Sequence, residues 1–209
     1  VLAGEKNKNV VVLCADLTES TRSLAFQKKF PERFVELGVA EQNLASVAAG
    51  MALAGKIPFI SSYATFSPGR NNEQIRTTIC YNNVPVKIVG SHSGISVGPD
   101  GATHQALEDI ALMRVLPNMK VICPGDPVEV EKAVSAMLAD PSPCYLRIGA
   151  RGEPRLHKPD VDFKLGRGIG MREGKDVAII ATGNMLANAV SAADLLEKGG
   201  VKAEIISMH

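Results

Sequence analysis

The chain of 209 residues lacks several features that mark common protein classes. Its four cysteines form no Cys-x-x-Cys pair, which argues against a zinc site and against a thioredoxin-like redox site. It contains no signal-peptide pattern and no apolar run of the roughly 18 residues that a membrane span needs. Lysine plus arginine (23) nearly balance aspartate plus glutamate (22), without blocks of like charge. Composition therefore favours neither nucleic acid nor a membrane as a partner.

What the chain does contain is typical of a globular protein, with 45% hydrophobic and 22% charged residues. Cys14 and Cys80 lie among apolar residues and are expected to pack as small hydrophobic side chains. Free cysteines of this kind suit a reducing compartment, so we expect a cytoplasmic protein. The chain starts at Val1 and stops just after a strand-like segment, so we expect both ends to be cut.

Apolar runs alternate with helical patterns through most of the chain, which is typical of a parallel sheet covered by helices on both faces. The expected strands cover residues 10–14, 34–37, 57–61, 86–90, 120–123 and 145–147. The expected helices cover residues 41–54, 72–81, 105–115 and 127–138. The sequence therefore predicts an α/β fold with a parallel sheet.

The residue composition changes after residue 150. Residues 151–175 are polar and punctuated by proline and glycine, and a new strand-helix-strand pattern follows at 177–181, 185–198 and 203–207. This segment is either a long excursion within one domain or a linker, and the restart of β-α-β order favours the linker. We predict a first domain at 1–150, a linker at 151–175 and the beginning of a second α/β domain at 176–209.

Two loops carry residues suited to acid-base chemistry, each where a predicted strand gives way to a helix. In the first, Glu41 opens a helix, where a glutamate is also favoured by the helix dipole alone. In the second, His92 and His104 flank a glycine-rich stretch that contains Asp100. A lone histidine is more often structural, but two histidines and an aspartate on one such loop are equally compatible with a functional site.

The segments G-V-A-E-Q-N at 38–43 and G-P-D-G-A-T-H-Q at 98–105 together resemble the pyrimidine-binding domain of transketolases, and the tail from Asp176 resembles the start of their C-terminal domain. These are enzymes of the pentose phosphate pathway that depend on thiamine diphosphate and magnesium. The resemblance implies that Glu41 hydrogen-bonds the aminopyrimidine of the cofactor, that Phe66 stacks on it and that Asp16 lies near it. For Phe66 a place in the core, and for Asp16 a helix-capping role, are equally good alternatives.

The same resemblance implies roles toward a sugar-phosphate substrate. His104 would contact hydroxyls and the developing oxyanion at the reacting carbon, Asp100 would accept a hydrogen bond from the sugar, and His92 would hold the sugar phosphate. Arg147 matches an arginine that pairs with the substrate phosphate, which suits a guanidinium fork. Ser20 matches a serine that assists the same phosphate, although helix capping is an equal alternative.

Three departures from the family pattern shape the prediction. Two further aromatics expected after Phe66 are replaced by Pro68-Gly69-Arg70-Asn71-Asn72, which leaves Arg70 or Tyr63 as substitutes. The chain also lacks a G-D-G motif with a following asparagine, and it lacks the first domain's histidines, so it cannot hold the diphosphate and magnesium alone. We therefore expect either the C-terminal subunit of a split transketolase or a fragment of a longer transketolase, in a homodimer or heterotetramer with an N-terminal, diphosphate-binding half.

Two alternatives remain at this point. A 1-deoxy-xylulose-5-phosphate synthase shares the glutamate and the D-G-x-T-H element, but those enzymes typically carry an acidic residue at the position of His92. A non-catalytic subunit that kept the fold has no physical need for the set of Glu41, His92, Asp100 and His104.

Overall fold

The computed structural model describes all residues from 1 to 209 and divides into two compact units. The larger unit consists of Val1–Val121 and Met137–Arg151, and the smaller of Ile122–Ala136 and Gly152–His209. Each unit contains its own sheet, of six and three strands. The predicted α/β class is confirmed. None of the helices has the length and apolar character that crossing a membrane requires.

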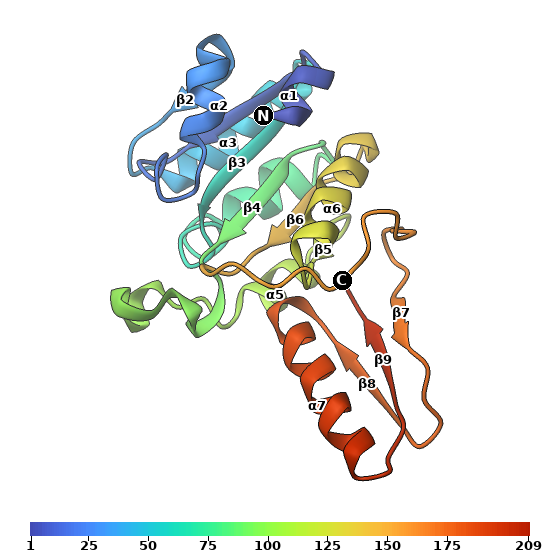
Figure 1. Ribbon diagram of the computed structural model, residues 1–209. Coiled ribbons are helices and arrows are strands. Elements are labelled where there is room, and N and C mark those ends of the chain that lie inside the picture. Colours follow the sequence, from blue (N-terminus) through green and yellow to red (C-terminus); the bar gives the residue numbers. More distant parts are fainter. The chain divides into compact units, whose positions relative to one another are not determined.

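The larger unit is built on a six-stranded sheet with the order β2-β1-β3-β4-β6-β5 (Figure 1). Its strands are β1 (Val10–Cys14), β2 (Phe34–Glu36), β3 (Ile57–Tyr63), β4 (Lys87–Ser91), β5 (Lys120–Ile122) and β6 (Cys144–Arg147). The pairs β1–β2, β1–β3, β3–β4 and β4–β6 are all parallel. All six predicted strands are therefore present, with bounds that shift by at most two residues.

Helices connect these strands, as parallel pairing requires. The connecting helices are α2 (Leu24–Lys29), α3 (Glu41–Leu53), α4 (Asn72–Gln74), α5 (Asp109–Arg114) and α6 (Pro127–Ala139), and α1 (Leu2–Lys6) precedes β1. Short 3₁₀ segments cover Pro31–Arg33, Gly94–Asp100 and Ala102–His104, and α4 continues as a π-helix over Ile75–Cys80.

One predicted helix is wrong at its start. The helix expected over residues 105–115 begins only at Asp109. Gln105 is extended instead, because Ala106 forms a parallel bridge with Ser93, and the backbone N–H of Gly94 donates to the Ala106 carbonyl at 2.8 Å. The tertiary pairing of the glycine-rich loop thus overrides local helix propensity.

Both faces of the sheet are apolar because successive side chains of a strand point to opposite sides. Val11 and Leu13 of β1 belong to the main core with Ile60 and Ile88, against which α3 and the π-helix pack. The neighbouring residues of β1 face the other way and form a smaller cluster of Val10, Val12, Phe26, Phe30, Phe34, Ile57, Phe59 and Leu138. A strand buried on both faces explains the unbroken Val10–Cys14 run.

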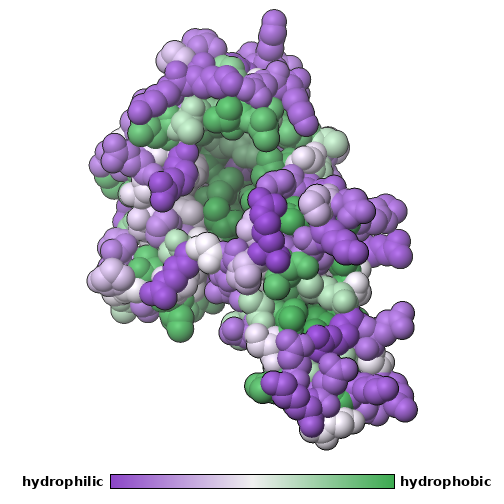
Figure 2. Space-filling model, viewed as in Figure 1, coloured by the Kyte–Doolittle hydropathy of each residue, from purple (hydrophilic) through white to green (hydrophobic).

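The second face is less completely covered. Ile57, Phe59 and Val89 are only partly buried there, although their neighbours Pro58, Ile60 and Ile88 are buried. In Figure 2, hydrophobic residues line a hollow in the upper part of the view, framed by hydrophilic ones.

The smaller unit has a three-stranded sheet with the order β7-β9-β8, the helix α7 and most of α6. Its bounds are β7 (Ile169–Arg172), β8 (Val177–Ala181), α7 (Leu186–Lys198) and β9 (Ala203–Ser207). β8 and β9 match the predicted ranges, and α7 begins one residue later than expected. β7 was not predicted: it pairs antiparallel with β9 and lies inside the segment expected to be a linker. Gly170 and the polar flanks obscure its strand pattern.

Candidate functional site

Most of the predicted site residues lie at the edge of the large sheet where the parallel strands end. Asp16 follows β1, Glu41 follows β2, Phe66 follows β3 and His92 follows β4, while Arg147 is the last residue of β6. Ligands of open α/β sheets bind at this edge. The parallel topology therefore gathers residues that are up to 131 positions apart in the sequence.

Glu41 is the first residue of α3, and only 2% of it is exposed. Gly38, with φ of 66°, turns the chain from β2 into the helix, a conformation that favours glycine. The carboxylate of Glu36 accepts the N–H of Gly38 and the N–H of Asp16, and so joins the loops after β1 and β2. Burial alone would raise the pKa of Glu36, but these N–H groups and the Thr18 hydroxyl lower it overall.

The turn after β3 is fastened to the start of α3. Fully buried Asn71 donates from Nδ2 to the backbone carbonyl of Glu41 at 2.9 Å and to Ser67 Oγ at 3.1 Å. Gly69 lets this turn close tightly, since a β-carbon there would lie 2.0 Å from the Thr65 carbonyl oxygen. The turn places Arg70 beside Glu41: Nη1 donates to Glu41 Oε2 at 2.8 Å.

Four rings lie together at this edge. Tyr63 stacks on His92 with ring centroids 3.9 Å apart and lies nearly parallel to Phe66 at 6.1 Å. His104 presents its ring edge-on to Phe66 at 5.3 Å and to Tyr63 at 6.2 Å. The guanidinium of Arg70 lies 4.7 Å from the centroid of Phe66. Phe66, His92 and His104 thus form one cluster, which Arg70 connects to Glu41.

His92 is held in a restricted conformation. Its φ of 54° is unusual for a residue with a side chain, and its Nδ1 lies 3.1 Å from Ser91 Oγ. Burial lowers the pKa of His92, and the negative charge of Asp100 opposes the shift only in part. His92 is therefore mostly neutral at pH 7, with one ring nitrogen a donor and the other an acceptor.

Arg147 is mostly buried and paired. Its Nε donates to Asp109 Oδ2 at 2.8 Å, and the hydroxyl of Tyr145 donates to the same oxygen at 2.7 Å. The Nη2 end lies next to Gly94, where a β-carbon would be 3.4 Å away, so the loop after β4 passes close to it. Asp109 was not predicted, although an aspartate that opens an apolar helix is a visible signal.

Two predicted residues do not join the cluster through any contact. Asp16 is exposed, has φ of 59° and uses its backbone N–H toward Glu36. Ser20 lies exposed in the turn between β1 and α2. Asp100 is also exposed, and it acts on the cluster only through its charge on His92.

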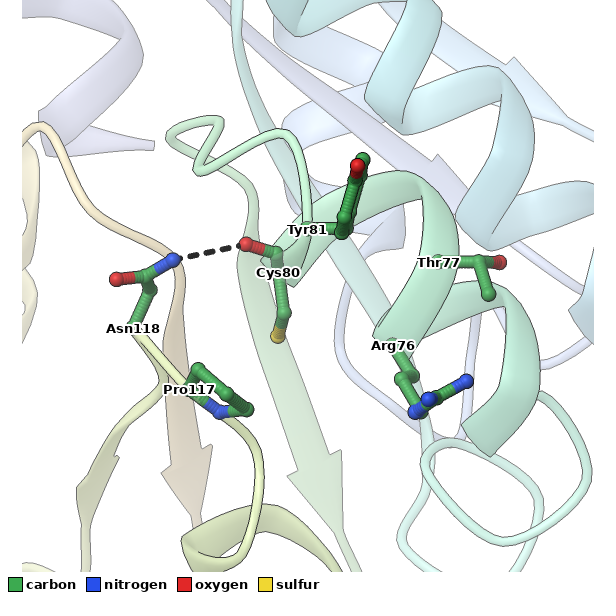
Figure 3. Close-up of a pocket in the computed structure, with 6 residues that line it drawn as sticks. All are labelled: Arg76, Thr77, Cys80, Tyr81, Pro117 and Asn118. Carbon is green, nitrogen blue, oxygen red and sulfur yellow. Dashed lines mark hydrogen bonds between the residues drawn. The ribbon is translucent and has the colours of Figure 1, made fainter.

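A pocket of about 600 Å³ lies elsewhere in the larger unit (Figure 3). Its lining consists of Arg76, Thr77, Cys80, Tyr81, Pro117 and Asn118. Asn118 Nδ2 donates to the carbonyl of Cys80 across it, and burial raises the pKa of the Cys80 thiol to about 11. Since Tyr81 precedes β4 and Pro117 precedes β5, the pocket lies toward the opposite edge from the ring cluster.

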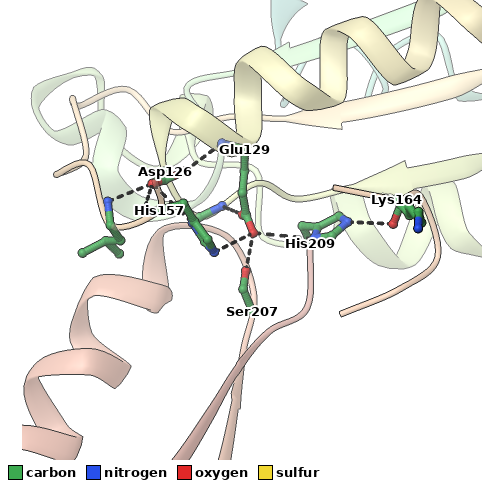
Figure 4. Close-up of polar contacts among 8 residues, drawn as sticks. Asp126, Glu129, His157, Lys164, Ser207 and His209 are labelled. Carbon is green, nitrogen blue, oxygen red and sulfur yellow. Dashed lines mark hydrogen bonds and ion pairs between the residues drawn. The ribbon is translucent and has the colours of Figure 1, made fainter. Parts of the chain in front are cut away.

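The smaller unit contains a buried polar cluster (Figure 4). Asp126 caps α6, accepting the N–H of Glu129 at 2.8 Å, and Glu129 reaches back to the N–H of Gly125 at 2.7 Å. Glu129 also accepts the Ser207 hydroxyl at 2.7 Å, and His157 lies between both carboxylates at 3.3 and 3.5 Å.

Asp126, Glu129 and His157 have donor atoms within 4.8 Å of one another, as a metal site would. Backbone N–H groups and a hydroxyl, however, already engage both oxygens of each carboxylate. Burial would raise the pKa values of Asp126 and Glu129, but these hydrogen bonds and nearby histidines lower both overall. Helix capping therefore accounts for the cluster without a metal ion.

Comparison with known proteins decides the family. A sequence model of the transketolase pyrimidine binding domain matches residues 2–151, and one of the transketolase C-terminal domain matches residues 166–209. The chain belongs to the transketolase family. This confirms the predicted resemblance, and with it membership of an enzyme family of transferases that depend on thiamine diphosphate.

Two transketolase relatives resemble the chain over nearly its whole length. A "Putative transketolase C-terminal section" from Methanocaldococcus jannaschii is 44% identical over 207 residues, which are 98% of this chain and 66% of that protein. A solved structure described as "Split gene transketolase, inactive beta4 tetramer" is 46% identical with a TM-score of 0.90, covering 99% of this chain and 67% of that one. This transketolase-family chain thus spans about two thirds of their length.

A third relative represents the alternative enzyme. The 1-deoxy-D-xylulose-5-phosphate synthase from Halothermothrix orenii is 36% identical over 210 residues, which are 99% of this chain and 32% of that enzyme.

Proposed function

We propose that the chain supplies the pyrimidine-binding half of a cytoplasmic transketolase of the pentose phosphate pathway. The reaction moves a two-carbon ketol unit from a ketose phosphate to an aldose phosphate. The observation that carries this proposal is the buried Glu41 at the start of α3, next to Phe66 and the two histidines. A buried carboxylate is costly to hold at the edge of a sheet, and titratable side chains gathered in one such place are candidates for a functional site.

The residues present fit one half of thiamine diphosphate. A flat ring, Phe66, and a buried carboxylate, Glu41, are both contacted by one planar N–H donor, Arg70, and this supports a flat hydrogen-bonding ligand at the same place. When bound, the cofactor supplies the carbanion chemistry, and the protein supplies binding, orientation and electrostatics. Glu41 would hold a proton at the ring nitrogen of the aminopyrimidine. The diphosphate and magnesium would be held by the partner half.

The substrate side is proposed for the histidines and Arg147. Neutral His92 donates or accepts one hydrogen bond toward the sugar phosphate, His104 faces the reacting carbon, and Asp100 accepts from a sugar hydroxyl. The Nε of Arg147 is committed to Asp109, so its outer nitrogens would face the phosphate. Roles for Asp16 near the cofactor and for Ser20 near the phosphate remain predictions.

The assembly is proposed from length. The chain spans about two thirds of transketolase relatives that are themselves sections or split subunits, so we propose an N-terminal, diphosphate-binding partner and a homodimer or heterotetramer. The domain division at 1–150, 151–175 and 176–209 also remains a prediction.

The test is ketol transfer from xylulose 5-phosphate to ribose 5-phosphate, with thiamine diphosphate and magnesium. The full-length chain is assayed alone and then with the diphosphate-binding half. Turnover only in the mixture supports the proposal. No turnover, in a complex shown to form, contradicts it.

The substitution Glu41→Gln, assayed in that active mixture, tests the proposed role of Glu41 directly. We expect its kcat to fall about 10²- to 10⁴-fold, the range for a lost proton-transfer group, with fold and assembly unchanged. Retention of most of the activity would rule out the proposed role of Glu41.

The second candidate is a 1-deoxy-xylulose-5-phosphate synthase activity, which the 36% identical relative favours. Product analysis with pyruvate in place of the ketose donor separates the two reactions.

A further inference from the structure

Arg70 occupies the place that the proposed function gives to the cofactor. Its Nη1 donates to Glu41 Oε2 at 2.8 Å, and its guanidinium lies 4.7 Å from the centroid of Phe66. Glu41 and Phe66 are the two groups proposed to meet the aminopyrimidine. One planar, N–H-bearing side chain of the chain itself therefore satisfies both of them.

We propose that Arg70 is a place-holder, which pairs with Glu41 until the cofactor arrives and must then move aside. This inference rests on the proposed function. It differs from the expectation that Arg70 substitutes for a missing aromatic, because a place-holder weakens cofactor binding whereas a stacking partner strengthens it.

The need for a place-holder follows from burial. Glu41 is 2% exposed, and a buried carboxylate without a partner is costly. Asn71, which is hydrogen-bonded to the same residue, binds the backbone carbonyl of Glu41 and not the carboxylate. The charge of Arg70 provides the compensation.

The side chain of Arg70 can move away from Glu41 because it is exposed, whereas the backbone of Arg70 is held in place. The backbone N–H of Arg70 donates to the Phe66 carbonyl at 2.9 Å, and fully buried Asn71 secures the next position. The side chain of Arg70, however, is 48% exposed. A guanidinium at the surface regains its hydration when it rotates away, so the side chain can leave while the turn stays in place.

The cost to cofactor binding is moderate for the same reason. A half-exposed ion pair and a surface cation–π contact are each weak, so together they reduce the cofactor's apparent affinity about 3- to 10-fold. Arg70 therefore lowers the fraction of sites that hold the cofactor but does not prevent the cofactor from binding.

The test replaces Arg70 by methionine, which keeps the length of the side chain and removes its charge. Arg76→Met is the matched control, since Arg76 is an exposed arginine that lines the separate pocket. Urea unfolding first confirms that both variants fold. Binding of thiamine diphosphate with Mg²⁺ to the complex with the diphosphate-binding half is then measured by titration calorimetry, so the readout does not depend on turnover.

We expect Arg70→Met to bind thiamine diphosphate about 3- to 10-fold more tightly than the unmodified complex, and Arg76→Met to bind it equally well. Equal or weaker binding by Arg70→Met overturns the place-holder, and weaker binding would identify Arg70 as a stacking partner. If the unmodified complex binds no thiamine diphosphate, the proposed function itself fails, and the place-holder with it.

Discussion

Gly90→Ala is the substitution whose cost can be worked out most directly. Gly90 lies in β4, and a β-carbon there would lie 2.3 Å from Tyr145 Oη and 2.6 Å from Tyr145 Cε2. Tyr145 is fully buried on the neighbouring strand and donates to Asp109 at 2.7 Å, so its ring cannot simply swing away.

Two costs add. Overpacking a well-packed core costs about 1–3 kcal/mol. Loss of a hydrogen bond to a charged group costs about 1.5–3 kcal/mol, and here it would be the bond from Tyr145 to Asp109. We expect Gly90→Ala to lower the free energy of unfolding of the larger unit by about 3–5 kcal/mol, a large part of a typical total of about 5–15 kcal/mol.

Tyrosine fluorescence during urea unfolding isolates the right unit. The chain has no tryptophan, and its three tyrosines, Tyr63, Tyr81 and Tyr145, all lie in the larger unit. Gly50→Ala is the matched control: Gly50 is an exposed residue of α3 with nothing within 4 Å of its would-be β-carbon, so we expect a gain of about 0.5–1 kcal/mol. If Gly90→Ala unfolds at the urea concentration of the unmodified chain, the packing argument is wrong.

Two further predictions concern titration and the buried polar cluster. Because burial lowers the pKa of His92 from 6.5, the unfolded chain binds that proton more readily; His92 therefore contributes stability above about pH 6.5, which is lost as the pH falls. His92→Gln should reduce the change in the urea midpoint between about pH 7.5 and about pH 5. A pH dependence equal to that of the unmodified chain would contradict this. Glu129→Gln should cost the smaller unit about 2 kcal/mol, because the carboxylate accepts from Gly125 and Ser207 in a buried place. Amide hydrogens of β9 should then exchange about 30-fold faster, whereas in the exposed control Glu131→Gln their rates should not change.

The strands could be predicted well from the sequence because a strand buried on both faces is an uninterrupted run of apolar residues. Val10–Cys14 is an uninterrupted apolar run that is buried throughout, and the structure gives the same bounds. Where local and tertiary preferences disagree, the prediction was wrong: Gln105 is not helical because its neighbour Ala106 pairs with the loop after β4. β7 was not predicted because Gly170 interrupts the apolar pattern of a strand of only four residues.

The candidate site shows the same division. Single residues such as Glu41 and His92 could be proposed from motifs, because a motif is local in the sequence. Their partners could not be, since the ion pair of Glu41 with Arg70 joins residues 29 positions apart, and that of Arg147 with Asp109 joins residues 38 apart. Only the folded sheet shows that these charges are already paired, and therefore which of their atoms remain for a ligand.

The interleaving of the two units has a consequence for biosynthesis and proteolysis. The smaller unit takes Ile122–Ala136 from the middle of the chain, and β6 of the larger unit is synthesised between this segment and Gly152–His209. Asp126 and Glu129 therefore leave the ribosome several seconds before Ser207, which Glu129 binds. A protease that cuts just after Gly152 should not release a second domain, because the fragment after the cut lacks Ile122–Ala136, which belongs to the same unit and carries the Glu129 that Ser207 binds. The two pieces should stay together until denaturant separates them.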